Sequence, residues 1–180
     1  MSPSSVPNII SLAAIAATAW LLLRKKEGDG EQSSVSPAPS SSGAYPNPAG
    51  RTLGYRNNNP LNIEYTGTVW KGEIRPSCQY RFAQFVSIPY GYRAGFRTIR
   101  TYINNYGVKT VRDIIHRWDV GNNNYVNFVC AKTGFSPDTV INPYDKQQME
   151  SLVSAMSWME NGFAPRQSEI DKGYYLYQTV

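Results

Sequence analysis

The chain has 180 residues, enough for one ordinary domain with additional segments, and carries a formal charge of +5. Residues 1–50 contain three basic and three acidic residues, so the whole excess belongs to the remainder, where it favours an anionic partner such as cell wall, membrane surface or nucleic acid. One histidine and two cysteines exclude HExxH and multi-histidine zinc sites, CxxC metal sites and a disulfide framework, so no metal or cofactor is expected.

An apolar segment lies near the N-terminus. Residues 9–23 are apolar apart from Ser11 and Thr18, and Arg24, Lys25 and Lys26 follow at once. A secretory signal would carry its positive charge before the apolar run, and none precedes it here, although a signal-peptide core remains the alternative. The segment therefore predicts one transmembrane helix over residues 6–24, and hence a single-pass membrane protein.

Residues 27–50 are rich in Ser, Pro, Gly and Ala and almost lack large apolar side chains. Such a composition cannot bury enough surface to order itself. We expect a flexible linker here, followed by one domain over residues 51–165 and a loosely packed tail over residues 166–180.

The first part of the domain carries consecutive asparagines. Asn57, Asn58 and Asn59 precede Pro60, and Asn62 follows, a pattern that favours a turn in which side chains bond the backbone. The functional interpretation is a sugar-binding edge, because amides can hydrogen-bond the acetamido and hydroxyl groups of a saccharide. Mixed aromatic and β-branched residues at 63–70 and 80–86 predict short strands or a hairpin.

Apolar residues then recur at helical spacing and predict three helices: one after Pro89, one starting near Thr110 and one after residues 122–124. Thr110 and Asp113 resemble a capping box. The positions expected to face inward are Tyr92, Phe96, Ile99, Ile103, Tyr106, Val111, Ile114, Ile115, Trp118, Tyr125, Phe128 and Val129. The single His116 is interpreted as a helix residue beside the core.

A fourth helix ends at Glu160, just before Asn161 and Gly162. Asn142 and Pro143 suit its start, and Met149, Leu152, Val153 and Met156 form an apolar stripe that Glu160 continues, whereas Glu150, Ser154, Ser157 and Asn161 form the opposite face. Burial and the negative end of the helix dipole should both raise the pKa of Glu160. A carboxyl group kept protonated suits an acid catalyst; the alternative is a structural ion pair with an arginine.

Four motifs together resemble a family of phage and prophage muralytic proteins. They are RNNNPLNI, WKG, YRFAQFVSIPYGYRAGFRTIRTYI and WMENG, and they cover roughly residues 51–163. The sequence ENGFAP at 160–165 also looks like the glutamate motif of lytic transglycosylases, and residues 58–63 and 70–72 resemble elements of bacterial β-N-acetylglucosaminidases. In those enzymes the glutamate helix precedes the asparagine motif, so the resemblance implies a circularly permuted, lysozyme-like α+β domain, mainly helical with a small β-hairpin region.

The resemblance implies that Glu160 is the catalytic acid, with Glu64 ranked second and Glu73 third. The substrate-binding residues that it implies, together with the aromatic composition, are Asn58, Asn59, Asn62, Trp70, Tyr92 and Tyr125. No second carboxylate stands out beside Glu160, which favours a single-acid mechanism with an anhydro or a reducing sugar as product.

The expected function is cleavage of MurNAc–GlcNAc bonds of peptidoglycan by a phage virion enzyme, as a lytic transglycosylase or muramidase, during genome delivery or lysis. The expected partners are glycan strands, a lipid membrane and other virion proteins. With the predicted anchor, the resemblance implies a single-pass protein of the virion membrane or the host inner membrane. Two alternatives remain open. One is an inactive cell-wall-binding or structural virion protein; the other, less favoured, is a nucleic-acid binder with aromatic stacking in a basic groove, although the basic residues are dispersed.

Overall fold

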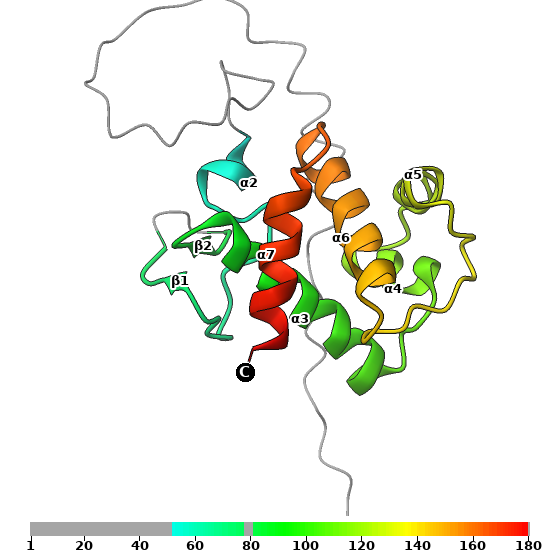
Figure 1. The fold of residues 1–180 in the computed structure, drawn as a ribbon, viewed down its shortest axis with the longest axis horizontal. Coiled ribbons are helices and arrows are strands. Elements are labelled where there is room, and N and C mark those ends of the chain that lie inside the picture. The colour runs from blue at the N-terminus through cyan, green and yellow to red at the C-terminus, as the bar shows by residue number, and fades with distance from the viewer. Residues whose placement is uncertain (1–51, 78–80, 180) are drawn as a thin grey trace, which may run out of the picture.

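The computed structural model describes residues 52–77 and 81–179. In chain order the elements are α2 (Leu53–Arg56), β1 (Glu73–Ile74), β2 (Gln84–Phe85), α3 (Ile88–Tyr106), α4 (Val111–Trp118), α5 (Asn123–Thr133), α6 (Lys146–Asn161) and α7 (Gln167–Gln178). The described chain is therefore mostly helical, with one small two-stranded sheet. In Figure 1, α6 stands between α7 on one side and α4 with α5 on the other, while α2 and the two strands lie beyond α7.

The predicted transmembrane helix ahead of the domain, and the single-pass membrane localisation that depends on it, find no support in the described structure. None of the helices in the described ranges combines the length and apolar character needed to cross a bilayer. Even α3, at 19 residues, carries Arg93, Arg97 and Arg100. Residues 6–24, over which that helix was expected, and the linker over 27–50 lie outside the described residues.

The sheet is smaller than the predicted hairpin. β1 and β2 pair antiparallel with Glu73 opposite Phe85, and an isolated bridge joins Glu64 to Phe82. β2 lies within the strand expected at residues 80–86. β1, however, begins after the strand expected at residues 63–70, where residues 66–69 are exposed and pair with no other strand.

Helix α3 forms because Tyr92, Phe96, Ile99 and Ile103 repeat at helical spacing, and all four are buried. It ends at Gly107, which adopts the left-handed conformation of a helix C-cap, and Tyr106 is exposed rather than inward. The Thr110 hydroxyl accepts a hydrogen bond from the Asp113 backbone N–H, so the predicted cap of α4 is present.

The expected loose tail is instead the helix α7, which packs on α3 (Figure 1). Gly173 permits this contact, since a Cβ at that position would lie 2.4 Å from the Cβ of Tyr92. The buried rings of Tyr174 and Tyr177 lie 5.3 and 5.6 Å from Phe96. Burial of these aromatic rings, together with the fully buried Ile170, holds the C-terminal segment in place.

Helix α6 is buried on two sides. It begins at Lys146 rather than after Pro143, because the Asp145 carboxylate caps it by accepting the Gln148 N–H. The face expected to meet solvent is covered: Ser157 and Asn161 are at most 1% exposed and Glu150 only 8%. The Ser157 hydroxyl bonds Tyr92 of α3, which shows what covers that face.

Candidate active site at the end of helix α6

The carboxyl group of Glu160 lies where three other parts of the chain converge on the last turn of α6. Its Oε2 accepts a hydrogen bond from Asn62 Nδ2 at 3.0 Å. Its Oε1 accepts from Trp118 Nε1 at 3.2 Å and from the Tyr125 hydroxyl at 3.1 Å. These donors come from the asparagine loop, the end of α4 and the first turns of α5.

Burial has the largest effect on the pKa of Glu160. Desolvation raises the pKa of its carboxyl group and outweighs the hydrogen bonds from Asn62, Trp118 and Tyr125, which lower it. The residue as a whole nevertheless keeps part of its surface exposed. Among the described residues no Arg or Lys forms a salt bridge with it, which removes the ion-pair alternative there.

The Tyr125 hydroxyl can serve Glu160 in either protonation state. It lies 3.1 Å from Glu160 Oε1 and 3.2 Å from the carbonyl oxygen of Met156. When Glu160 is ionised, the single hydroxyl proton can go to the carboxylate. When Glu160 is protonated, the acid can donate to Tyr125 while Tyr125 donates to Met156, with no movement of heavy atoms.

The asparagine loop is shaped by its own backbone and side chains. Asn58 and Asn62 have φ angles of 51° and 50°, in the left-handed region that asparagine tolerates better than most residues. The buried amide of Asn59 donates to the carbonyls of Ile63 and Ala83 and accepts the Ile63 N–H, which closes the loop. The conformation of this loop therefore directs the Asn62 amide towards the Glu160 carboxyl group.

Asn161 fastens the loop to α6. Its Nδ2 donates to the Pro60 carbonyl at 2.7 Å, and its Oδ1 accepts from the Thr52 hydroxyl at 2.5 Å. Gly54 lies against Asn161 and Asn62: a Cβ at position 54 would come within 2.9 Å of the side-chain oxygens of both residues. Asn161, the residue after Glu160, therefore fixes the position of the asparagine loop relative to Glu160.

The rival acids hold other positions. Glu64 forms a salt bridge with Arg81 at 3.4 Å, next to its isolated bridge with Phe82. The Glu73 side chain is fully buried; its Oε2 accepts the Trp70 N–H and pairs with Arg75 at 3.0 Å. In the described structure neither carboxylate forms a hydrogen bond with Glu160 or with its three donors, Asn62, Trp118 and Tyr125.

Of the predicted substrate-binding residues, the structure brings Asn62 and Tyr125 to Glu160. Asn58 instead donates to the Phe85 carbonyl, and Asn59 is fully buried inside the loop. Tyr92 is fully buried in the core, where its hydroxyl bonds Tyr55 and Ser157. Trp70 packs partly buried against the core and bonds through its backbone to Glu73.

The sequence alone did not reveal two residues near Glu160. Trp118 fitted the apolar stripe of α4, but its indole N–H bonds the Glu160 carboxylate. Asp119, only 4% exposed, ends the same helix; burial raises its pKa, and its charge acts to raise that of Glu160. The available signal was their position at a helix end directly before the Asn122–Asn124 turn.

Metal ligation has no basis in residues 52–77 and 81–179, which contain no group of three or more His, Cys, Asp and Glu side chains placed to hold an ion.

Comparison with known proteins places the chain in a phage context. No known family model matches it. It is similar to Protein P5 of Pseudoalteromonas phage PM2, with 39% identity over 129 residues that cover 67% of this chain and 79% of the relative.

Proposed function

The chain belongs to the family of Protein P5 of phage PM2, and within that phage context we propose that it is an enzyme that cleaves the glycan strands of bacterial peptidoglycan. Glu160 is its acid catalyst in this proposal. The residue resemblance to muralytic proteins supplies the substrate class, and the geometry around Glu160 supplies the chemistry.

One observation carries the proposal: a desolvated carboxyl group with a raised pKa, without a cationic partner among the described residues, on a residue that is still partly exposed. A structural carboxylate buried at a helix end is normally paired with a cation, because an isolated charge is costly to bury. A general acid needs the opposite arrangement, in which the proton is retained until a leaving oxygen accepts it.

In the proposed reaction protonated Glu160 donates its proton to the oxygen that joins C1 of MurNAc to C4 of GlcNAc. The C1–O bond breaks, GlcNAc leaves with a free 4-hydroxyl, and an oxocarbenium-like centre remains at C1. The Glu160 carboxylate then takes a proton from the C6 hydroxyl as O6 bonds C1, giving a 1,6-anhydro sugar. If water attacks instead, the product is a reducing sugar.

The neighbouring donors suit this cycle. After proton transfer Glu160 carries a negative charge, and Asn62, Trp118 and Tyr125 stabilise that charge by hydrogen bonds. The Tyr125 hydroxyl can then reverse its bond when the carboxyl group is protonated again. Because three elements hold the donors, the carboxyl group stays in one position throughout.

The test is digestion of purified peptidoglycan by the full chain, followed by mass spectrometry of the released fragments. We expect anhydro or reducing muropeptides from the parent and none from folded Glu160→Gln. Glu64→Gln, which alters the rival acid, should release the same fragments as the parent.

Two outcomes would overturn the proposal. Equal release by the parent and by Glu160→Gln would place the acid elsewhere. No release by any of the three proteins, with retained binding to peptidoglycan, would favour a cell-wall-binding or structural phage protein.

A further inference from the structure

Arg117, near the end of α4, lies against two tyrosine rings of α3. Its Cζ is 4.0 Å from the centroid of the Tyr106 ring and 4.8 Å from that of the Tyr102 ring. Tyr102 and Tyr106 are four residues apart and therefore share one face of α3. Contact with two aromatic rings stabilises the guanidinium group and restricts its movement.

This guanidinium group has no acidic partner. Among the described residues Arg117 forms no salt bridge, whereas Arg75, Arg81 and Arg112 each pair with a carboxylate. Its Nε is buried and lacks an acceptor. The two Nη groups also lack an acceptor within the described part of the chain, but unlike Nε they are not buried, and the residue is half-exposed. They are therefore available to an anion from outside the chain.

Contacts between aromatic rings connect Arg117 to the Glu160 site. The Tyr102 ring meets the Trp118 ring at 6.5 Å, with an angle of 62° between the planes. Trp118 in turn donates its indole N–H to Glu160. Arg117 thus lies one tyrosine ring beyond the indole that bonds the proposed acid, and a glycan strand bound at Glu160 can extend to it.

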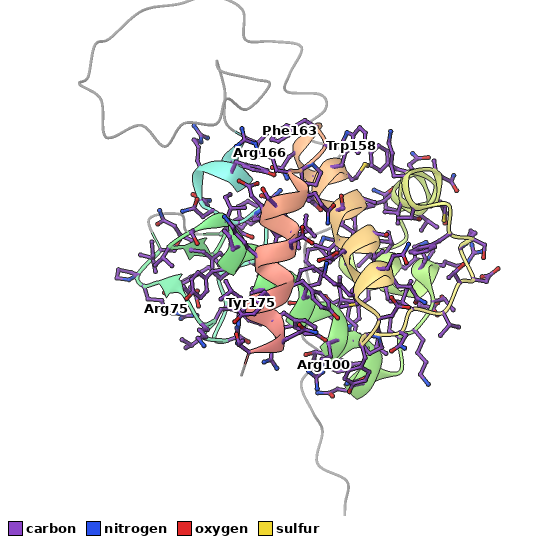
Figure 2. All side chains as sticks on the ribbon, in the orientation of Figure 1. Arg75, Arg100, Trp158, Phe163, Arg166 and Tyr175 are labelled. Carbon is purple, nitrogen blue, oxygen red and sulfur yellow. The ribbon has the colours of Figure 1, made fainter. Side chains whose placement is uncertain are left out.

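Arg100 offers the same chemistry on another side of α3. It lies 5.1 Å from the Tyr144 ring and 6.0 Å from the Tyr177 ring, and forms no salt bridge within residues 52–77 and 81–179. It is two positions before Tyr102, which separates the two residues by about 200° around the helix. Figure 2 shows Arg100 at the end of the domain opposite Phe163, which follows the end of α6. Arg100 is therefore a matched control for Arg117.

The proposed substrate supplies an anion that fits Arg117. Each MurNAc ring of peptidoglycan can carry a peptide stem with free carboxylates, and a guanidinium group binds a carboxylate through two parallel hydrogen bonds. Membrane surfaces and nucleic acids are instead bound by several cations in a row. The exposed residues just before Tyr106, Asn104 and Asn105, are uncharged. A single guanidinium group beside them suits one carboxylate better than a row of phosphates.

We propose that Arg117 binds a carboxylate of the peptide stem on a MurNAc ring, and so selects glycan strands that carry acidic stems. Arg117 is a binding residue in this arrangement and takes no part in proton transfer. The proposal deepens the proposed function, on which it rests for the identity of the substrate, because it adds the peptide to the part of peptidoglycan that is recognised.

The test compares the binding of two matched ligands to the full chain by isothermal titration calorimetry. One is the disaccharide GlcNAc–MurNAc with a peptide stem whose carboxylates are free, and the other has the same stem with its carboxylates amidated. Neither contains the MurNAc–GlcNAc bond that the proposed reaction breaks, so binding is measured whether or not cleavage occurs. We expect the parent to bind the acidic ligand about tenfold more tightly than the amidated one, and Arg117→Gln to lose this preference.

Two further variants complete the test. Arg117→Lys keeps the charge but not the paired donors, so its preference should fall to about threefold, and it serves as the second variant should Arg117→Gln fail to fold. Arg100→Gln should keep the preference of the parent.

Equal affinity of the parent for both ligands, no binding of either up to ~10 mM, or an unchanged preference in Arg117→Gln would overturn the proposal. A preference for acidic stems without muropeptide release from peptidoglycan would reject the proposed reaction and leave the Arg117 site standing. Release without this preference would do the reverse.

Discussion

At the scale of the residue, the main feature is a carboxyl group whose burial and hydrogen bonds act in opposite directions. Three donors reach Glu160 and favour its ionised form, yet desolvation prevails and its pKa rises. Asp119 adds to the rise through its charge. The same atoms that lower the cost of ionisation would stabilise the carboxylate once it has given up its proton.

This balance makes the stability of the protein depend on pH through Glu160. The folded pKa is above the ordinary 4.5, so the unfolded chain loses its proton first as pH rises. The ionised form then costs stability, which decreases from about pH 4.5 up to the folded pKa, by at most ~1.4 kcal/mol per pH unit. Glu160→Gln removes this loss. Denaturant unfolding between pH 4 and 8 should show the variant gaining on the parent as pH rises, and parallel curves would contradict the predicted shift.

Tyr125→Phe tests the reversible hydrogen bond. The substitution removes a donor that favours ionised Glu160, so the pKa of Glu160 should rise further and the alkaline limb of muropeptide release should move to higher pH. We also expect about 1–2 kcal/mol lower stability, because the Met156 carbonyl loses a partner. Tyr177→Phe is the matched control: it removes another buried hydroxyl, bonded to Pro143, and should leave the pH profile in place. An unshifted limb in Tyr125→Phe would count against the role of Tyr125.

At the scale of the element, α3 and α6 together hold the asparagine loop against the site. Asn161 at the end of α6 bonds the loop at Pro60. From the other side α3 approaches so closely that a Cβ at Gly91 would lie 2.2 Å from the Asn58 carbonyl oxygen. The loop that carries Asn62 is thus enclosed by two helices, and its position depends on a missing side chain.

Gly91→Ala should push the loop off α3. The clash is with backbone, which cannot rotate away as a side-chain end can, so we expect a loss of about 1–3 kcal/mol in unfolding free energy and a fall in muropeptide release. Gly67→Ala is the control, since nothing lies within 4 Å of its added methyl group. Thermal unfolding together with fragment release checks both, and a Gly91→Ala protein as stable and active as Gly67→Ala would disprove the close approach.

Much of the helical framework could be predicted from the sequence, for reasons that particular residues show. Apolar spacing at Phe96 and Ile99 marks α3, and the Thr110 cap marks the start of α4. Contacts between residues far apart in the sequence were harder to predict. The amphipathic pattern predicted that Ser157 faces solvent, whereas α3 covers it. The hydrogen bond from Trp118 to Glu160 depends on how α4 crosses α6, which the sequence pattern does not specify.

At the scale of the whole molecule, α6 is the central support. Glu160 lies in its last turn, and α7 covers a further part of the domain by packing on α3 (Figure 1). The C-terminal segment is therefore part of the fold that carries the Glu160 site. Its tyrosines, dispersed among polar residues, give a weak amphipathic signal, which explains why the sequence suggested a tail.

Tyr174→Ala should show how much α7 contributes. The side chain is 2% exposed and its ring lies against Phe96 and Tyr177, so its removal should cost about 3–5 kcal/mol and lower the melting temperature markedly. The adjacent Tyr175 is 67% exposed, and Tyr175→Ala should change stability by no more than about 0.5 kcal/mol. Calorimetry of the two variants decides the matter; equal melting temperatures would mean that α7 is not part of the cooperative fold.

The most direct test of the central proposal is the initial rate at which the full chain releases soluble fragments from purified peptidoglycan, measured beside Glu160→Gln at one pH. If Glu160 is the acid, the folded variant should be slower by about 10²–10⁴-fold, the usual contribution of a positioned proton donor. Equal rates in the two proteins would contradict the assignment of Glu160 as the group that protonates the glycosidic oxygen.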